Sequence, residues 1–293
     1  MIAGSRGSAL AMWQTEHVKR LLGVPVDIQV ITTRGDVDRT SKLQGKLEKG
    51  FFTEELEAAL RESRIDFAVH SLKDLPTKGP EDLVIGAVLE RAPSNDRLLV
   101  RGPLPLKAGA KVGASSLRRE ALLKTYYPGA QAALLRGNVP TRVKKLQAGE
   151  YDAIVLAAAG LTRLGLETHG LTVYELNPHR WVPAPGQGAI AVQCRRADAK
   201  TREALLKLQH EPTARAVGIE RELLRIFEGG CTAPFGALVT GNVLRAGVEQ
   251  NGQWRATKRE IPSAPDETFY RQTLDVLAKA GNDDDETWLH REV

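Results

Sequence analysis

Short apolar runs alternate with helical patterns over much of residues 1–195. The runs are rich in Val, Ile, Leu and Ala, which is typical of strands buried on both faces of a sheet. Apolar residues recur at helical spacing between them, as at Leu10, Trp13, Val18 and Leu21. This alternation predicts α/β layers built on a largely parallel sheet. The strands are expected at residues 26–31, 66–69, 83–88, 112–113, 132–135, 153–157 and 189–194.

The pattern changes near the C-terminus. A long helix is expected over residues 214–227, ending at Gly229 and Gly230. Short strands at 238–240, 243–248 and 253–257 and a last helix at 273–279 then predict a small α+β domain. Segments rich in Pro and Gly at 91–95, 101–109 and 182–188 are candidate crossings between domains.

Charge and hydropathy narrow the class of protein. The net charge of +5 favours acidic partners without separating nucleic acid from small carboxylates or phosphates. Aromatic residues are only 5% and no nucleic-acid motif occurs, so we expect no nucleic-acid partner. No apolar run reaches the roughly 18 residues of a membrane span. The first residues include Arg6 and lack the apolar stretch of a secretory signal, so we expect no membrane association and a cytoplasmic location.

Three strand-to-helix turns combine small polar residues with arginine. They lie at residues 4–8, 114–119 and 136–142. The open N–H groups of a helix start bind anions, and arginine pairs with carboxylates through two planar hydrogen bonds. Ordinary helix capping explains any single turn equally well, but three in one chain favour a cleft for a polyanion.

The segment at residues 69–76, VHSLKDLP, takes an apolar strand directly into charged residues. Charged residues at the carboxyl end of such a strand are candidates for a site. Asp74 could act as a general acid or base, or as a fixed negative charge beside a cation. A solvated loop accounts for Lys73 and Asp74 as well, so this segment alone does not decide.

The two cysteines call for different explanations. Cys231 follows Gly229 and Gly230 in an open loop, which suits covalent attachment or nucleophilic use, although a free cysteine is often a small buried apolar residue. Cys194 ends an apolar run and is expected to be buried. The chain has no zinc-binding spacing, no P-loop and no GxGxxG motif, so neither a metal nor a nucleotide cofactor is expected.

Eight segments, in this order, resemble the hydroxymethylbilane synthase (porphobilinogen deaminase) family. Their most specific motifs are HSLKDLPT, SSLRR, LRGNV, PAPGQG and GGC. The segments are residues 6–14, 50–60, 66–77, 112–120, 135–146, 151–166, 183–191 and 220–237.

The resemblance implies a fold and a reaction. Two α/β domains of the periplasmic-binding-protein type, residues 1–90 with 188–208 and residues 95–183, would flank a cleft, with a C-terminal α+β domain at 211–293. The implied reaction joins four porphobilinogen molecules head to tail through azafulvene intermediates, releasing ammonia each time, on a covalently bound dipyrromethane cofactor. A monomer is also implied.

The resemblance also assigns residues. Cys231 matches the thioether position of the cofactor, and Asp74 matches the catalytic aspartate. Each pyrrole ring carries an acetate and a propionate, and the matching positions that contact these groups or the cofactor form two sets. The cofactor set is Lys73, Ser116, Arg118, Arg119 and Arg136. The substrate set is Arg6, Ser8, Arg142, Arg163 and Lys49.

Three places depart from the family pattern. In the segment 45–55, Leu47 and Glu48 are unusual and Glu54 replaces a common lysine, which leaves the role of this segment as a basic lid open. Residues 92–96, APSND, replace the usual DPRDA beside the first crossing, and residues 233–235 after the cysteine differ more mildly. The alternative functions are a binding module with the same fold but no catalysis, and a nucleic-acid binder.

Overall fold

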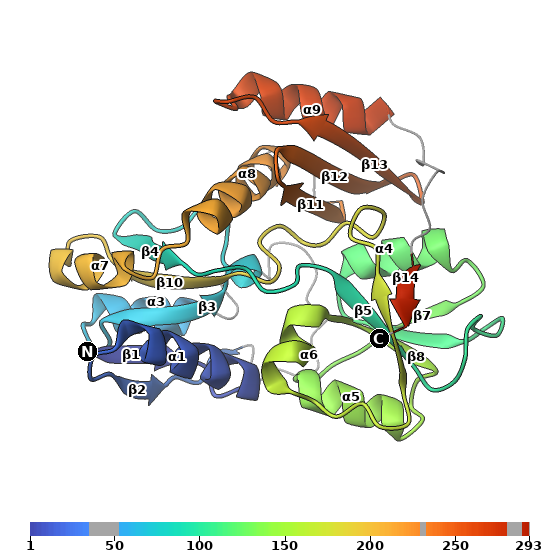
Figure 1. Ribbon diagram of the computed structural model, residues 1–293, viewed down its shortest axis with the longest axis horizontal. Helices are drawn as coiled ribbons and strands as arrows, with labels where there is room; N and C mark the ends of the chain where they lie inside the picture. Colours follow the sequence, from blue (N-terminus) through green and yellow to red (C-terminus); the bar gives the residue numbers. More distant parts are fainter. Residues whose placement is uncertain (35–52, 229–232, 280–288, 293) are drawn as a thin grey trace. The chain divides into compact units, whose positions relative to one another are not determined.

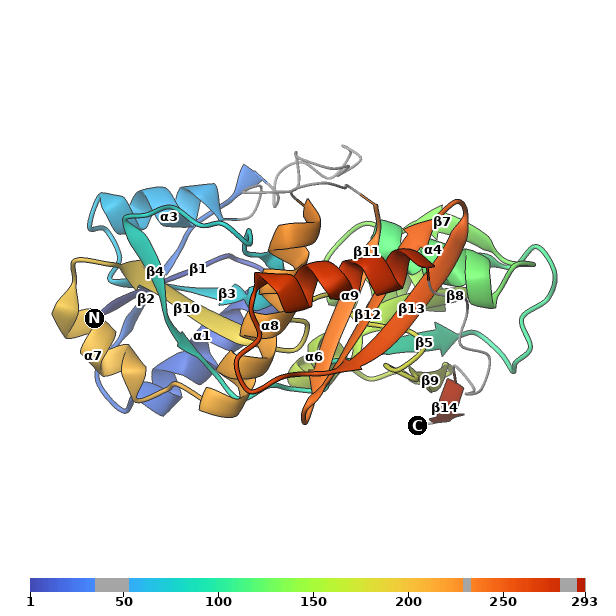
Figure 2. The ribbon, with the colours of Figure 1, turned by 90° about the horizontal axis from the view of Figure 1, so that it is seen from above.

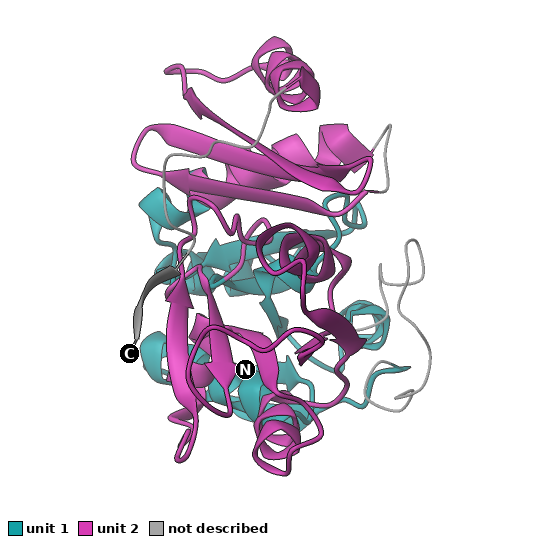
Figure 3. Cartoon of the chain, turned by 90° about the vertical axis from the view of Figure 1, so that its right-hand side faces the viewer, with its two compact units in different colours: residues 1–92, 188–215 teal, residues 93–187, 216–293 magenta. Residues whose placement is uncertain are grey.

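The computed structural model describes residues 1–34, 53–228, 233–279 and 289–292. The chain forms two compact units, coloured separately in Figure 3. Unit 1 comprises Met1–Ala92 and Gly188–Arg215, and unit 2 comprises Pro93–Gln187 and Ala216–Val293. No helix in these ranges is long and apolar enough to cross a membrane.

Unit 1 is built on a five-stranded sheet of order β2-β1-β3-β10-β4 (Figure 1). Strand β1 pairs in parallel with β2 and β3, whereas β10 is antiparallel to β3 and β4. The strands are β1 (Ile2–Ser5), β2 (Asp27–Val30), β3 (Phe67–Ser71), β4 (Leu83–Val88) and β10 (Ile190–Arg195). The helices are α1 (Ala9–Leu22), α3 (Glu54–Arg61) and α7 (Ala199–Leu206), and a 3-10 turn covers Leu72–Asp74.

The two faces of this sheet bury separate cores because successive side chains of a strand point to opposite faces. Phe67 and Val69 pack with Val18 of α1 on one face. Ala68 packs with Leu56 of α3 on the other. Helices therefore cover both faces, as the apolar strands predict.

Unit 2 contains a six-stranded sheet of order β14-β9-β5-β8-β6-β7. Strand β6 is parallel to β7 and β8, and β5 is antiparallel to β8 and β9. The strands are β5 (Asp96–Val100), β6 (Lys111–Ala114), β7 (Gln131–Leu134), β8 (Ala153–Ala157), β9 (Thr172–Leu176) and β14 (Leu289–Glu292). The helices that follow β6, β7 and β8 are α4 (Leu117–Tyr126), α5 (Val139–Gln147) and α6 (Ala158–Leu164).

A three-stranded antiparallel sheet completes unit 2, with α9 (Glu267–Lys279) packed on it (Figure 2). Its strands are β11 (Phe235–Thr240), β12 (Val243–Gln250) and β13 (Gln253–Glu260). Asn251 and Gly252 join β12 to β13 and both have positive φ, of 53° and 81°. Asn-Gly is the preferred pair for such a two-residue hairpin. Helix α8 (Glu211–Glu228) precedes this sheet in the chain.

The predicted fold class, α/β layers with a small C-terminal α+β part, is confirmed. Each strand expected from the sequence overlaps an observed one, whereas β1, β5, β9 and β14 are not predicted. Strand β5 lies between the two Pro- and Gly-rich segments at 91–95 and 101–109, and its first two residues, Asp96 and Arg97, are charged, so no apolar run marks its start. The predicted division into three domains remains a prediction.

Candidate active site

In unit 1 the predicted site residues lie at one edge of the sheet. Arg6 and Ser8 follow β1, and Lys73 and Asp74 follow β3. Strands β1 and β3 are neighbours and run parallel, so their carboxyl ends meet at the same edge. Lys73 and Asp74 are both exposed there. The structure therefore brings together the residues that the β1–α1 turn and the HSLKD segment contribute.

Two hydrogen bonds hold residues at this edge of the sheet in place. Ser8 caps α1, its hydroxyl accepting a hydrogen bond from the N–H of Ala11 at 3.3 Å. One turn further along α1, buried Gln14 donates to the hydroxyl of Ser71 at 2.9 Å. The second bond ties the first helix to Ser71, where β3 ends, two residues before Lys73.

A buried polar group lies behind the same edge, on the α3 face. His70 is 5% exposed, and burial lowers its pKa to about 4, with the charge of Arg6 as a smaller cause in the same direction. Because of this lowered pKa, His70 is neutral at physiological pH. Gln193 donates to Glu57 at 3.2 Å, and burial raises the pKa of Glu57.

In unit 2 the predicted residues also follow parallel strands. Ser116, Arg118 and Arg119 follow β6, while Arg136 and Arg142 flank the turn after β7. The carboxyl ends of β6, β7 and β8 share one edge because the strands are parallel. Arg163 lies further along, near the end of α6, and burial lowers its pKa to about 10.

The start of α4 differs from the other helix starts at which arginines gather. Ser116 occupies its N-cap position but makes no side-chain capping hydrogen bond. By contrast, Ser8 caps α1, and Asn138 caps α5 by accepting from the N–H of Thr141 at 2.9 Å. The first-turn N–H groups of α4 are thus not satisfied by Ser116, and they remain suited to an anion.

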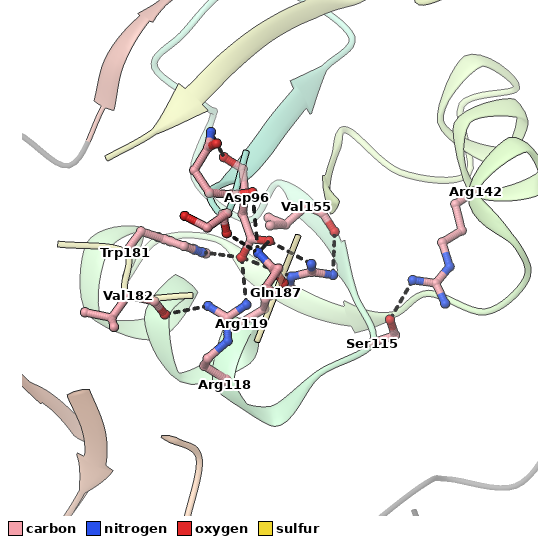
Figure 4. Close-up of polar contacts among 11 residues, drawn as sticks. Asp96, Ser115, Arg118, Arg119, Arg142, Val155, Trp181, Val182 and Gln187 are labelled. Atoms are coloured by element: carbon pink, nitrogen blue, oxygen red, sulfur yellow. Dashed lines mark hydrogen bonds and ion pairs between the residues drawn. The ribbon is translucent and has the colours of Figure 1, made fainter. Parts of the chain in front are cut away.

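Arg142 is held against the turn that precedes α4. Its Nε donates to the carbonyl of Gly137 at 2.6 Å. Its Nη1 donates to the hydroxyl of Ser115 at 2.8 Å (Figure 4). This contact places the guanidinium of α5 beside the residue that precedes Ser116.

Asp96, the first residue of β5, is the centre of a buried hydrogen-bond network (Figure 4). Arg119 forms a two-pronged pair with it, from Nη2 to Oδ1 at 2.7 Å and from Nε to Oδ2 at 3.2 Å. Arg118 Nη2 donates to Oδ2 at 2.8 Å. The indole of Trp181 donates to Oδ2 at 3.0 Å, and the amide of Gln187 donates to Oδ1 at 2.9 Å.

The electrostatics of this network follow from burial. Asp96 is fully buried, and desolvation opposes its ionised form, but the two guanidiniums outweigh it and hold its pKa far below the usual range. Burial lowers the pKa of Arg118 and the charge of Arg119 adds to this, although Asp96 acts against it. Two positive charges meet one negative charge, which leaves one positive charge buried. Nε of Arg118 is also buried, and no hydrogen-bond partner for it occurs among the described residues.

Several buried residues behind the site are not predicted from the sequence. Asp96 binds the arginine pair, and Trp181 and Gln187 are neutral donors to Asp96 rather than to the arginines. Glu220 of α8 is fully buried and accepts from the N–H groups of Gly186 and Val239, each at 2.8 Å. Gln187 and Gly186 belong to the PAPGQG motif, for whose residues the sequence predicts no individual role.

Two predicted residues, Cys231 and Lys49, lie outside the described residues. Cys194 is fully buried, as predicted, and burial raises the pKa of its thiol. A buried thiol of raised pKa is a poor nucleophile. Within the described ranges, no group of three His, Cys, Asp or Glu side chains is placed to hold a metal ion.

Comparison with known proteins gives a consistent picture. A family model described as porphobilinogen deaminase, dipyromethane cofactor binding domain, matches residues 1–203. The probable porphobilinogen deaminase of Methanocaldococcus jannaschii is 42% identical over 275 residues, which cover 90% of this chain and 93% of the relative. The porphobilinogen deaminase of Desulforamulus reducens is 46% identical over 243 residues, covering 80% and 78%. That of Synechococcus elongatus is 41% identical over 278 residues, covering 89% and 86%.

Proposed function

The chain belongs to the porphobilinogen deaminase family, and from this premise we propose which of its residues carry out the reaction. It is a hydroxymethylbilane synthase, a transferase that condenses four porphobilinogen molecules head to tail and releases ammonia at each step. The observation that carries the residue assignment is the arginine pair at the open start of α4, with one positive charge that Asp96 does not balance.

The residues at the start of α4 fit a dipyrromethane group. Such a group carries acetate and propionate carboxylates, and carboxylates are what free helix N–H groups and guanidiniums bind. Ser116 leaves the first turn of α4 uncapped, and the buried Nε of Arg118 has no described protein acceptor. We assign the carboxylates of the group to Ser116, Arg118, Arg119, Arg136 and Lys73.

Cys231 is the proposed attachment residue. When bound, the group supplies an electron-rich pyrrole carbon as the nucleophile. A thioether to Cys231 would keep the growing chain attached to the protein through all four condensations, while the free carbon of its terminal ring is the nucleophile at each one. Cys194 is a poor alternative because it is fully buried in the core of unit 1.

Asp74 is the proposed catalytic residue. Its position in the turn after β3 leaves the carboxylate exposed at the edge that also carries Arg6 and Ser8. There it can hydrogen-bond the aminomethyl nitrogen of porphobilinogen and hold the proton that leaves with ammonia. Its negative charge would also stabilise the positive charge that develops on the substrate carbon as the C–N bond breaks.

The remaining residues bind the carboxylates of incoming porphobilinogen. We assign this role to Arg6, Ser8, Arg142, Arg163 and Lys49. Arg142 is the best supported of these because Gly137 and Ser115 fix its guanidinium in place. A fixed guanidinium loses little conformational entropy when it binds a carboxylate.

We further propose the three-domain division at residues 1–90 with 188–208, 95–183 and 211–293. A monomeric, cytoplasmic protein without a nucleic-acid partner completes the proposal. Light scattering on the purified protein tests the monomer directly, since a dimer would double the measured mass.

Arg142→Leu tests the carboxylate assignment. A hydrogen bond to a charged group contributes about 1.5–3 kcal/mol, so KM for porphobilinogen should rise by about tenfold or more. Arg101→Leu is the matched control, because Arg101 is an exposed arginine of the same unit and stands at the end of β5. Unchanged KM and product formation in Arg142→Leu would remove Arg142 from the substrate site.

A further inference from the structure

Asp96 holds Arg118 and Arg119 at once, and we propose that it is a positioning residue that sets where the two guanidiniums present their charge to pyrrole carboxylates. The proposal rests on the assignment of Arg118 and Arg119 to the carboxylates of the dipyrromethane group. Asp96 itself would touch neither cofactor nor substrate, since its side chain is fully buried among protein donors.

The carboxylate of Asp96 is fixed on all sides. Five hydrogen bonds reach its two oxygens, three from the arginines and one each from Trp181 and Gln187. A carboxylate has about four lone-pair sites, so this one is saturated. It can neither rotate nor accept a sixth donor without losing one that it has.

The arginines are fixed at both ends of their side chains. Their backbones belong to the first turn of α4. Their guanidiniums also donate to backbone carbonyls, Arg118 to Val182 at 2.8 Å and Arg119 to Val155 at 3.3 Å. Long side chains held in this way lose no further rotamer entropy on binding, which is how preorganisation strengthens recognition.

Asp96 also sets the net charge of the pair. One carboxylate against two guanidiniums leaves a single positive charge, which suits one ligand carboxylate. Two carboxylates would neutralise the pair and remove its attraction for an anion. None would leave two positive charges buried together, which is strongly unfavourable. Anion binding by the arginine pair therefore depends both on there being a single protein carboxylate beside it and on where that carboxylate lies.

A purely structural role would predict a different set of effects. Any damage to the network would then lower stability, and ligand binding would change only as far as stability does. A positioning role predicts that moving the carboxylate impairs ligand binding, whereas removing a neutral donor to the same carboxylate does not.

Asp96→Glu tests this distinction, because it keeps the charge and shifts the carboxylate by one methylene. Trp181→Phe is the matched control, since it removes one neutral donor to Asp96 from the same buried cluster and leaves both ion pairs. The measurements on parent and variants are the melting temperature, the fraction carrying the two-ring adduct by intact mass, and KM and kcat for porphobilinogen.

We expect both variants to melt at lower temperature than the parent. Asp96→Glu should also have a smaller loaded fraction and a KM raised about tenfold or more, because a misplacement of about 1 Å can cost on the order of 100-fold. Trp181→Phe should keep the KM and loaded fraction of the parent.

Equal effects of the two variants on KM and loading would overturn the positioning role. So would failure of both Asp96→Glu and Asp96→Asn to fold, because Asp96 would then be needed for the fold itself. The parent separates the two proposals: a parent without adduct and without turnover would count against the proposed function, whatever the variants do.

Discussion

Asp74 carries the most specific assignment among single residues. It follows β3 in a 3-10 turn, and its side chain is exposed at the edge where Arg6 and Ser8 also lie. Its identity as a charged residue at the end of an apolar strand could be read from the sequence. Its neighbours could not, because they come from residues more than sixty positions away in the chain.

Asp74→Asn should reduce kcat by about 100-fold to 10,000-fold, the usual contribution of a positioned acid or base. The amide keeps the shape of the side chain but holds neither the proton nor the negative charge. Product formation and the melting temperature are the measurements, and Asp27→Asn, at an exposed position in the same unit, is the control. Near-normal turnover in Asp74→Asn would take this residue out of the mechanism.

His70 gives unit 1 a pH-dependent stability. Its pKa is lowered from 6.5 to about 4 in the folded protein, so the unfolded chain binds the proton more readily. The contribution of neutral His70 to the free energy of unfolding is fully present above pH 6.5. It is lost as the pH falls from 6.5 to about 4, which lowers the free energy of unfolding by about 3 kcal/mol in total.

His70→Gln should remove that loss. Denaturant unfolding at pH 7 and at pH 4 gives the decrease in the free energy of unfolding between these two pH values. This decrease should be smaller in the variant than in the parent by about 3 kcal/mol. His169→Gln, at a highly exposed histidine, is the control and should retain the full fall. The same fall in His70→Gln as in the parent would contradict a neutral, buried His70.

At the scale of elements, pattern and turn chemistry predicted most of the fold. The apolar runs gave β2, β3, β4, β8 and β10 because strands buried on both faces are continuous in the sequence. Strand β5 was missed because its first two residues are charged. Asp96 is charged for a reason that only the fold reveals: it meets Arg118 and Arg119 from 22 and 23 positions away.

Some residues of the candidate site could likewise be predicted from the sequence, whereas others are shown only by the fold. Arg118, Arg119 and Arg142 were predicted from the strand-to-helix turns, since small residues and arginines there suit anions. Trp181 and Gln187 were not, because a hydrogen bond between residues some 90 positions apart leaves no local pattern. Helix capping was equally hidden, as Ser8 caps its helix and Ser116 does not.

Substitution by alanine is expected to have opposite effects on stability at two glycines of unit 2. A Cβ on Gly236 of β11 would lie 2.7 Å from the carbonyl oxygen of Val182 and 3.0 Å from that of Pro183, and backbone atoms cannot move aside cheaply. Gly236→Ala should therefore destabilise the protein by about 1–3 kcal/mol. A Cβ on Gly218, inside α8, would meet nothing within 4 Å.

Gly218→Ala should accordingly stabilise the protein by about 0.5–1 kcal/mol, because alanine is the better helix former. Thermal unfolding of both variants beside the parent measures the contrast. Opposite shifts in melting temperature are expected, and a stabilising Gly236→Ala would show that β11 does not pack closely against residues 182–183.

At the scale of the whole molecule, the chain passes between its two units after residues 92, 187 and 215. Residues close to these three points form hydrogen bonds within unit 2. Asp96 and Gln187 belong to the arginine network, and Glu220 accepts from the N–H groups of Gly186 and of Val239 in β11. Helix α8, which carries Glu220, leads along the chain to Cys231. The proposed reaction therefore depends on a cofactor held at that cysteine.

The most direct test is the intact mass of the purified protein beside Cys231→Ser and Cys194→Ser. We predict a mass excess of two linked pyrrole units in the parent and in Cys194→Ser, and none in Cys231→Ser. An excess that persists in Cys231→Ser, or that is absent from the parent even after incubation with porphobilinogen, would contradict the account.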